Sequence, residues 1–366
     1  MEEEYFVGID LHRQYFTCYA TNGKGDEILK ERLSNCQEAV DYLVKHFPFP
    51  PKVVIEATRN WMWLVRALRE KGCQVSLAHP LKTKAIASAR IKTDLLDAKT
   101  LSHLLRSNLV PSSYVASEEE QDNRELARGR IALVHYQTMI KNRIRAILGK
   151  ENLSYSGSDL FGKGGRAWLK KQQLPETKRK MVKIYLERLD DLISAIRKVD
   201  ELIQEKSSRL SEVKLLTSIP GVGTTTAFLL AAEIGDIKRF NTAKQFASYF
   251  GLVPRLHQSG NHQYYGRITK LGNPYVRWAL VQTAHRLARM DRNYKWFVDR
   301  ISYRGGKKKA IVALARKLAT IIFCILKEKR EYIIKDYQSN YQRVGRLKVC
   351  PAILPERTRK NLVALV

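Results

Sequence analysis

The chain has 366 residues, of which 44% are hydrophobic and 28% charged, and its formal net charge is +29. This composition is typical of folded domains. No apolar run is long enough to span a bilayer, so we exclude membrane-embedded proteins and expect no membrane partner. The five cysteines are scattered, odd in number and without CxxC spacing. Their pattern disfavours a disulfide framework or a zinc site and indicates a reducing cytoplasm.

The positive charge is concentrated in the later part of the chain. Residues 1–100 hold 15 basic and 13 acidic residues, whereas the remainder holds 50 and 23, so the two parts carry +2 and +27. This asymmetry indicates a polyanionic partner, and nucleic acid is the leading candidate. A membrane surface is the weaker alternative, because no long basic amphipathic helix stands apart from the folded segments.

Apolar periodicity predicts an α/β arrangement for the first part of the chain. It predicts a meander of three strands over 5–11, 15–20 and 27–33. After the meander it predicts a helix over 37–46, a strand over 52–57, a helix over 61–71, a strand over 74–78 and a helix that starts near 81. Strands that alternate with helices after a meander indicate a mixed sheet with helices packed on it.

Four carboxylates stand at the ends or starts of these elements. Asp10 ends the first strand and Glu56 lies near the end of a later one, where an ionised group is costly unless it is paired or bound to metal. Asp94 and Asp97 follow a Thr93 N-cap and share one helix face, about 5–6 Å apart at Cβ. Four such oxygen ligands suit Mg²⁺. The alternatives are exposed strand ends and Asp placement favoured by the helix dipole.

The middle of the chain is helical and rich in charge. Helices are predicted over 118–153 and 176–210, separated by a Gly/Ser loop over 154–165. Two long helices around a loop predict a helical hairpin or coiled-coil arm. A solvated charge face, an oligomer contact and nucleic-acid binding remain open for it.

A tight turn over 218–223 leads into a helix over 224–234, in a layout that resembles a helix-hairpin-helix element. Gly221 and Gly223 would let the backbone approach a phosphate at the helix N-terminus, although an ordinary turn between packed helices is the alternative. A polar loop is predicted over 252–274, in which basic, aromatic and glycine residues interleave as in nucleic-acid contacts. Further helices are predicted over 241–251, 275–289 and 307–328.

Several short motifs follow one another in a fixed order: Gly8-Ile9-Asp10, Ile55-Glu56-Ala57-Thr58, Lys92-Thr93-Asp94-x-x-Asp97-Ala98, Ser218-Ile219-Pro220-Gly221-Val222-Gly223, Gly251-Leu252-Val253-Pro254-Arg255, Gln258-Ser259-Gly260 and Ile268-Thr269-Lys270-x-Gly272-Asn273. The set resembles insertion-sequence transposases that have an N-terminal DEDD, RuvC-like domain and a C-terminal serine-bearing transposase domain. Relatives include Piv-type DNA invertases and bridge-RNA-guided recombinases. The resemblance extends to about Lys329.

The resemblance implies an RNase H-like fold at the N-terminus, with Mg²⁺ bound by Asp10, Glu56, Asp94 and Asp97. It implies that Ser259 forms a covalent phosphoserine link to DNA. It also implies a homo-tetramer built as a dimer of dimers, a structured bridge RNA that pairs with donor and target DNA, and a place in the prokaryotic cytoplasm at the nucleoid. The expected domains are a RuvC-like catalytic domain over 1–115, a basic helical arm over 116–210, a mainly helical transposase domain over 211–335 and a basic tail over 336–366.

A serine hydroxyl is a weak nucleophile at neutral pH and needs a base or a metal to activate it. His257 lies beside Ser259 and could act as that base, but metal held by the carboxylates is the better activator. We expect phosphate contacts from Arg255, Arg267 and Lys270, and from Arg277 on the following helix. From the residues alone, a turn serine beside a glycine is the favoured interpretation of Ser259, and only the family resemblance reverses it.

Two other functions compete with the transposase interpretation. A junction-resolving nuclease would use water and two metal ions, with Ser259 as a bystander. A non-catalytic nucleic-acid-binding protein would need none of the carboxylates. Nothing in the sequence specifies the target site, the guide RNA or the host.

Overall fold

The computed structural model describes residues 4–57, 61–87, 93–260 and 262–333. The chain divides into two compact units, 1–117 and 118–366. Thr58, Lys92 and the predicted tail over 336–366 lie outside the described residues. Among the described residues, every helix is too short or too polar to cross a lipid bilayer.

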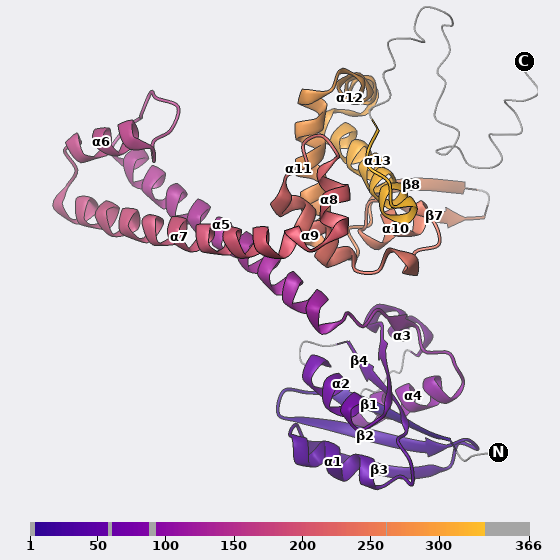
Figure 1. The fold of residues 1–366 in the computed structure, drawn as a ribbon. Coiled ribbons are helices and arrows are strands. Elements are labelled where there is room, and N and C mark those ends of the chain that lie inside the picture. The colour runs from indigo at the N-terminus through magenta and orange to yellow at the C-terminus, as the bar shows by residue number, and fades with distance from the viewer. Residues whose placement is uncertain (1–3, 58–60, 88–92, 261, 334–366) are drawn as a thin grey trace, which may run out of the picture. The chain divides into compact units, whose positions relative to one another are not determined.

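The first unit is built on a mixed six-stranded sheet (Figure 1). Its strands, in the order β3-β2-β1-β4-β5-β6, have the bounds β3 Glu27–Ser34, β2 Tyr15–Asn22, β1 Tyr5–Leu11, β4 Lys52–Glu56, β5 Gln74–Ala78 and β6 Ser112–Ser113. The meander β1-β2-β3 is antiparallel, while β4 is parallel to both β1 and β5. The predicted meander and mixed sheet are therefore confirmed.

Helices cover both faces of this sheet. The helices α1 (Gln37–Lys45) and α2 (Trp61–Glu70) share one apolar core with the strands, which includes Leu43, Leu64, Ile9 and Ile55. On the opposite face α4 (Asp94–Arg106) packs Leu101 against Val54 and Ala78. A short helix, α3 (Pro80–Ile86), follows β5.

The second unit begins with two long helices, α5 (Glu118–Lys150) and α7 (Glu176–Ser208), which pack along one another. Figure 1 shows a short helix, α6 (Lys163–Lys171), at the end of this pair that lies away from α8–α13. Leu148, Phe161, Leu169 and Leu189 form a small core there. The predicted helical arm is present, but the loop after α5 covers 151–162 and not 154–165, and the helix α6 that follows it was not predicted.

The rest of the second unit is mainly helical, as predicted: α8 (Ser211–Thr217), α9 (Thr224–Ile234), η1 (Ile237–Arg239), α10 (Ala243–Tyr249), α11 (Pro274–Met290), α12 (Arg292–Gly305) and α13 (Lys307–Glu328). Its core surrounds the apolar α13, where Leu314, Leu318 and Ile322 meet Phe228 and Phe246. The helix α12 was not predicted; its N-cap is Asp291, whose side chain accepts from two backbone N–H groups.

The prediction of a polar loop over 252–274 is wrong. The chain forms a β-hairpin there, from β7 (Pro254–Ser259) and β8 (His262–Ile268). A turn with Gly260 at φ +56° joins the strands. Such a turn needs a residue that tolerates positive φ, and glycine provides it. All six residues of β7 are polar or partly exposed, which hid the strand from a search for apolar alternation.

Candidate active site

The strand register places two of the four predicted carboxylates on the same face of the sheet. Ile9 of β1 lies opposite Ile55 of the parallel strand β4, and both side chains enter the core beneath α1 and α2. Since side chains alternate along a strand, the next residues, Asp10 and Glu56, point to the opposite face, which α4 covers. Asp10 is buried, and Glu56 is partly buried.

Gly8 lets α4 approach this face closely. A Cβ atom at Gly8 would lie 2.1 Å from the carbonyl oxygen of Ala98 and 2.4 Å from the backbone nitrogen of Ser102. The Ser102 hydroxyl also donates to the carbonyl of Phe6 over 2.9 Å. No other residue type would fit between β1 and α4 at this spacing, so a glycine two residues before Asp10 brings the helix close to the carboxylate.

The first turn of α4 presents the other two carboxylates. The side chain of Thr93 accepts from the backbone N–H of Leu96 over 3.2 Å, which confirms the predicted N-cap. Asp94 and Asp97 lie in the turn that follows. Asp94 meets Asp10 around a histidine: the Nε2 atom of His12 lies 3.2 Å from Oδ2 of Asp10 and 3.4 Å from Oδ1 of Asp94.

Asp10 is buried beside two other carboxylates and a histidine. Burial raises the pKa of Asp10, and the neighbouring charges of Asp94 and Asp97 raise it further, while His12 lowers it. Asp97 is therefore close enough to act on Asp10. A cation among these groups would relieve the repulsion and favour the ionised carboxylate.

His12 and Tyr15 are site residues that the sequence did not reveal. The Tyr15 hydroxyl donates to Oδ2 of Asp94 over 3.0 Å, and loss of solvent together with this bond raises the pKa of Tyr15. The guanidinium carbon of Arg32 lies 3.4 Å from the centre of the Tyr15 ring. Only the position of His12 in the sequence could have indicated its role, because it follows Asp10 by two residues, just after the end of β1.

The donor atoms of Asp10, His12 and Asp94 all lie within 4.8 Å of one another. Two carboxylates and an imidazole in this arrangement suit a divalent cation. Glu56 shares the sheet face of Asp10, and Asp97 acts on the Asp10 charge. The donor set of the first unit therefore fits a divalent metal centre.

Ser259 belongs to the second unit. It ends β7, is exposed, and pairs with His262 across the hairpin. His257 lies opposite Tyr264, with ring centres 6.4 Å apart. Alternation along β7 puts His257 and Ser259 on the same face. The hairpin contains no Asp or Glu, so the serine has no carboxylate partner on its own element.

The predicted phosphate-binding residues have different surroundings. Arg255, Arg267 and Lys270 are exposed on the hairpin and just beyond it. Arg277 is partly buried on α11 and donates to the carbonyl of Phe250 over 3.1 Å. Arg277 therefore binds the backbone just before the hairpin begins. Nucleic-acid binding by all four residues stays a prediction.

The turn predicted over 218–223 joins α8 to α9, in the order of elements expected of a helix-hairpin-helix-like segment. Gly221 has φ +81°, and its carbonyl accepts from Arg286 of α11 over 3.2 Å. Gly223 is the N-cap of α9 and is exposed, and a Cβ atom there would meet nothing within 4 Å. The turn is thus fixed on α11, with the start of α9 open to solvent.

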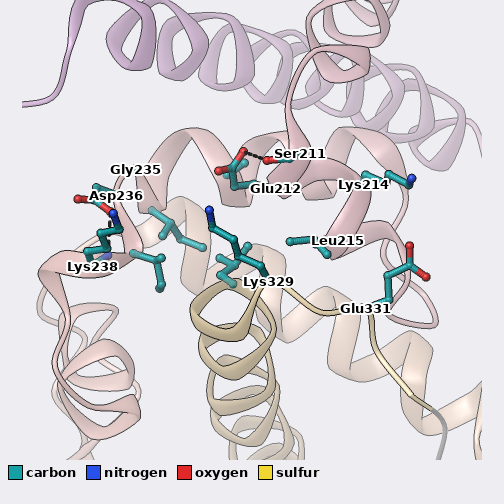
Figure 2. Close-up of a pocket in the computed structure, with 13 residues that line it drawn as sticks. Ser211, Glu212, Lys214, Leu215, Gly235, Asp236, Lys238, Lys329 and Glu331 are labelled. Atoms are coloured by element: carbon teal, nitrogen blue, oxygen red, sulfur yellow. Dashed lines mark hydrogen bonds between the residues drawn. The ribbon is translucent and has the colours of Figure 1, made fainter.

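A hollow of about 430 Å³ lies in the second unit at the opposite ends of α8 and α9 from this turn. Figure 2 shows acidic and basic side chains around an apolar floor: Glu212, Asp236 and Glu331, with Lys214, Lys238 and Lys329. The Ser211 hydroxyl donates to Glu212 over 3.2 Å. This balanced charge does not favour a phosphate, and none of the predicted catalytic residues lines the hollow.

A sheet that carries an acidic cluster, joined in one chain to a basic helical unit, is the layout expected of an enzyme that acts on nucleic acid. Residues 7–151 match a DEDD transposase model of the IS110 type, described as Transposase, and residues 213–299 match the model described as Transposase IS116/IS110/IS902 family. Together the two ranges cover more than half of the chain. The chain belongs to this transposase family, and it is an enzyme that cuts and rejoins DNA.

Curated relatives agree with this assignment. The chain is 27% identical to a "Probable family 20 transposase" of Pseudomonas aeruginosa, over 89% of this chain and 98% of the relative. It is 28% identical to the "Transposase for insertion sequence element IS1111A" of Coxiella burnetii, over 91% and 92%. It is 29% identical to a "Pilin gene-inverting protein" of Moraxella bovis, over 76% and 81%.

Proposed function

We propose that this transposase cuts and rejoins DNA through a covalent phosphoserine intermediate, with Ser259 as nucleophile and with Mg²⁺ held by Asp10, Glu56, Asp94 and Asp97. The observation that carries the proposal is the division of the chemistry. The acidic cluster lies in the first unit, while the exposed serine stands on a hairpin of the second unit that has cations but no carboxylate. The proposed nucleophile and the proposed metal ligands therefore come from different units of the chain.

The chemistry balances without a further reactant. The Oγ atom of Ser259 attacks the phosphorus of a DNA phosphodiester, the Oγ–P bond forms as a P–O bond to deoxyribose breaks, and the departing oxygen takes up a proton. Attack by a second strand's hydroxyl on the phosphoserine reverses the exchange and releases the serine. Mg²⁺ held by the four carboxylates would supply positive charge at the phosphate and would favour loss of the serine proton.

The residues of this chain position the reaction. Asp94 is held by the Tyr15 hydroxyl over 3.0 Å and faces Asp10 across His12. Arg255 and Arg267 are exposed on the hairpin that presents Ser259, where a guanidinium can hold a phosphate by two hydrogen bonds. His257 shares the strand face of Ser259 and is a further candidate to accept its proton.

The remaining parts of the proposal concern assembly. We propose that the enzyme is a homo-tetramer, arranged as a dimer of dimers, in which the carboxylates of one subunit act with the serine of another. We also propose that a bridge RNA pairs with donor and target DNA. The chain is proposed to have four domains, with boundaries at 115, 210 and 335. The tetramer and the shared sites rest on the family resemblance, and the serine and the carboxylates lie in different units of the chain.

The deciding experiment traps the covalent link. The protein is incubated with Mg²⁺ and nicked suicide DNA that carries the cleavage site, and DNA that stays attached under denaturing conditions is measured. The native chain should form the adduct. Ser259→Ala should lose it, while Ser158→Ala, an exposed serine in the loop after α5, should retain it.

The same assay separates the competing nuclease. If Ser259→Ala still cuts the DNA with Mg²⁺ and no variant forms an adduct, water is the nucleophile and the proposal is wrong. Asp10→Asn should abolish both cutting and adduct formation while DNA binding persists. Adduct formation that survives in Asp10→Asn would contradict the assigned role of the carboxylates.

A further inference from the structure

The helical arm is divided by charge into two parts. We define the arm tip as residues 141–183, which hold the end of α5, all of α6 and the start of α7. The arm stem comprises residues 118–140 and 184–210. The arm tip holds 12 basic and 3 acidic residues, a net charge of +9, whereas the arm stem holds 8 and 11, a net charge of −3.

In the arm stem, most cations are neutralised by partners within the chain. Arg130 pairs with Asp200 across α5 and α7, and Arg124 and Arg128 reach Glu233 of α9. Two further stem pairs are Arg188–Asp191 within α7 and Arg209–Glu205, which joins the C-cap residue of α7 to its last turn. The arm stem therefore uses its charge to hold helices together and has little left for a polyanion.

In the arm tip, the acids are already engaged. Glu151 pairs with Lys178, Glu176 pairs with Lys180, and Asp159 accepts from the backbone N–H of Phe161 over 3.0 Å. The surplus cations form an exposed set that has no ion pair among the described residues: Arg143, Lys150, Lys163, Lys170, Lys171, Arg179 and Lys183.

These cations stand on an ordered support. The small core of the arm tip buries Leu148, Phe161 and Leu169 between the three helices. Lys170 and Lys171 follow Lys163 by seven and eight residues, about two helical turns along α6, so the three lie on one side of that helix. The arm tip is an ordered cationic surface rather than a loose basic tail.

We propose that the arm tip binds the phosphate backbone of double-stranded DNA, at a distance along the DNA from the phosphodiester that reacts. The enzyme acts on DNA, and DNA carries about one negative charge per 1.7 Å of duplex axis. Contacts from exposed lysine and arginine side chains to phosphates hold the backbone and carry no sequence information. The arm tip thus increases the affinity for DNA and lengthens the DNA segment in contact with the protein, whereas other parts of the enzyme select the target sequence.

The proposal deepens the function proposed above but does not depend on its serine chemistry, because binding is measured without cleavage. We compare K170Q/K171Q in the arm tip with R197Q/K198Q, an adjacent exposed pair in the arm stem without an ion pair among the described residues. Both variants lose two positive charges, so a general effect of net charge is the same in each.

Binding of the full-length chain to a short DNA duplex and to an RNA duplex of the same sequence is measured against salt concentration. For DNA, K170Q/K171Q should reduce the slope of log K against log salt by roughly 1 to 2, and R197Q/K198Q should leave it unchanged. Equal slopes in the two variants would overturn the proposal.

Two further results would also overturn it. Weaker binding to RNA alone would assign the arm tip to RNA. A changed molar mass in solution with unchanged DNA binding would assign it to contacts between subunits. The circular dichroism of both variants serves as the check that α6 and α7 remain folded.

Discussion

Arg128 and Glu233 form a two-point ion pair that joins the arm to the rest of the second unit. The Nε and Nη2 atoms of Arg128 donate to the two carboxylate oxygens of Glu233 over 2.6 and 2.8 Å. Glu233 is almost fully buried in α9 and also accepts from the Asn273 side chain over 2.6 Å. Asn273 is the N-cap of α11. One carboxylate thus connects α5, α9 and the start of α11.

Removing the arginine should destabilise the second unit more than removing both partners. Arg128→Met leaves the Glu233 carboxylate buried with fewer donors, and we expect a loss of about 3 kcal/mol in the free energy of unfolding. Replacing both residues by Met should recover part of this loss. Urea unfolding followed by far-ultraviolet circular dichroism measures it, because the second unit contains most of the helix. The matched control, Arg197→Met, should be close to neutral, and an equal loss there would contradict the prediction.

Gly8 allows a second prediction, which concerns the distance between α4 and the sheet. Gly8→Ala would place a methyl group 2.1 Å from the Ala98 carbonyl, so α4 must move and take Asp94 and Asp97 away from Asp10. We expect the rate of DNA cleavage to fall by more than tenfold, because moving a catalytic group by about 1 Å can lower a reaction rate about a hundredfold.

The control for Gly8 is Gly23→Ala, because a Cβ atom at Gly23 would meet nothing within 4 Å. That variant should cleave DNA normally. Cleavage and thermal unfolding are measured for both variants at saturating Mg²⁺. Normal cleavage by Gly8→Ala would mean that the chemistry does not need α4 against β1.

His12 should contribute to metal affinity. Its Nε2 atom lies between Asp10 and Asp94, at 3.2 and 3.4 Å. His12→Ala should raise the Mg²⁺ concentration for half-maximal cleavage by roughly tenfold, the lower end of the effect seen for residues that orient metal ligands. Calorimetric titration with Mn²⁺ gives a readout that does not depend on cleavage. His46→Ala, an exposed histidine at the end of α1, should change neither value.

Much of the first unit was predictable because its strands are apolar and its helices are amphipathic. The predicted strands over 5–11 and 74–78 have the observed bounds. The position of Asp10 at the end of a buried strand and the Thr93 N-cap both follow from local rules. His12 and Tyr15 were missed because their contacts with Asp94 join residues 79 or more positions apart, and no local pattern encodes such a pair.

The second unit was less predictable where its residues are polar. The strand that carries Ser259 is exposed along most of its length, so its sequence has no apolar alternation to mark it. The helix α6 is short and begins among glycines, which are typical of loops. The role of Ser259 rested on family resemblance, because an isolated exposed serine has no chemical signature of its own.

Gly272 should fix the base of the hairpin that carries Ser259. It has φ +88°, and a Cβ atom there would lie 1.9 Å from the carbonyl oxygen of Tyr249. Gly272→Ala therefore strains the backbone by about 1–3 kcal/mol and pushes the segment after β8 away from α10. We expect a lower thermal midpoint together with weaker formation of the serine–DNA adduct.

A substitution within the hairpin itself provides the control. At Gly266 a Cβ atom would approach its nearest neighbours only to 3.8 Å, an ordinary contact distance, so Gly266→Ala should leave the thermal midpoint unchanged. The comparison is made on adduct yield relative to the amount of DNA bound, which removes any difference in binding. If Gly272→Ala forms the adduct as well as the native chain does, the base of the hairpin does not position Ser259, and orientation of the nucleophile must come from the bound DNA or a neighbouring subunit.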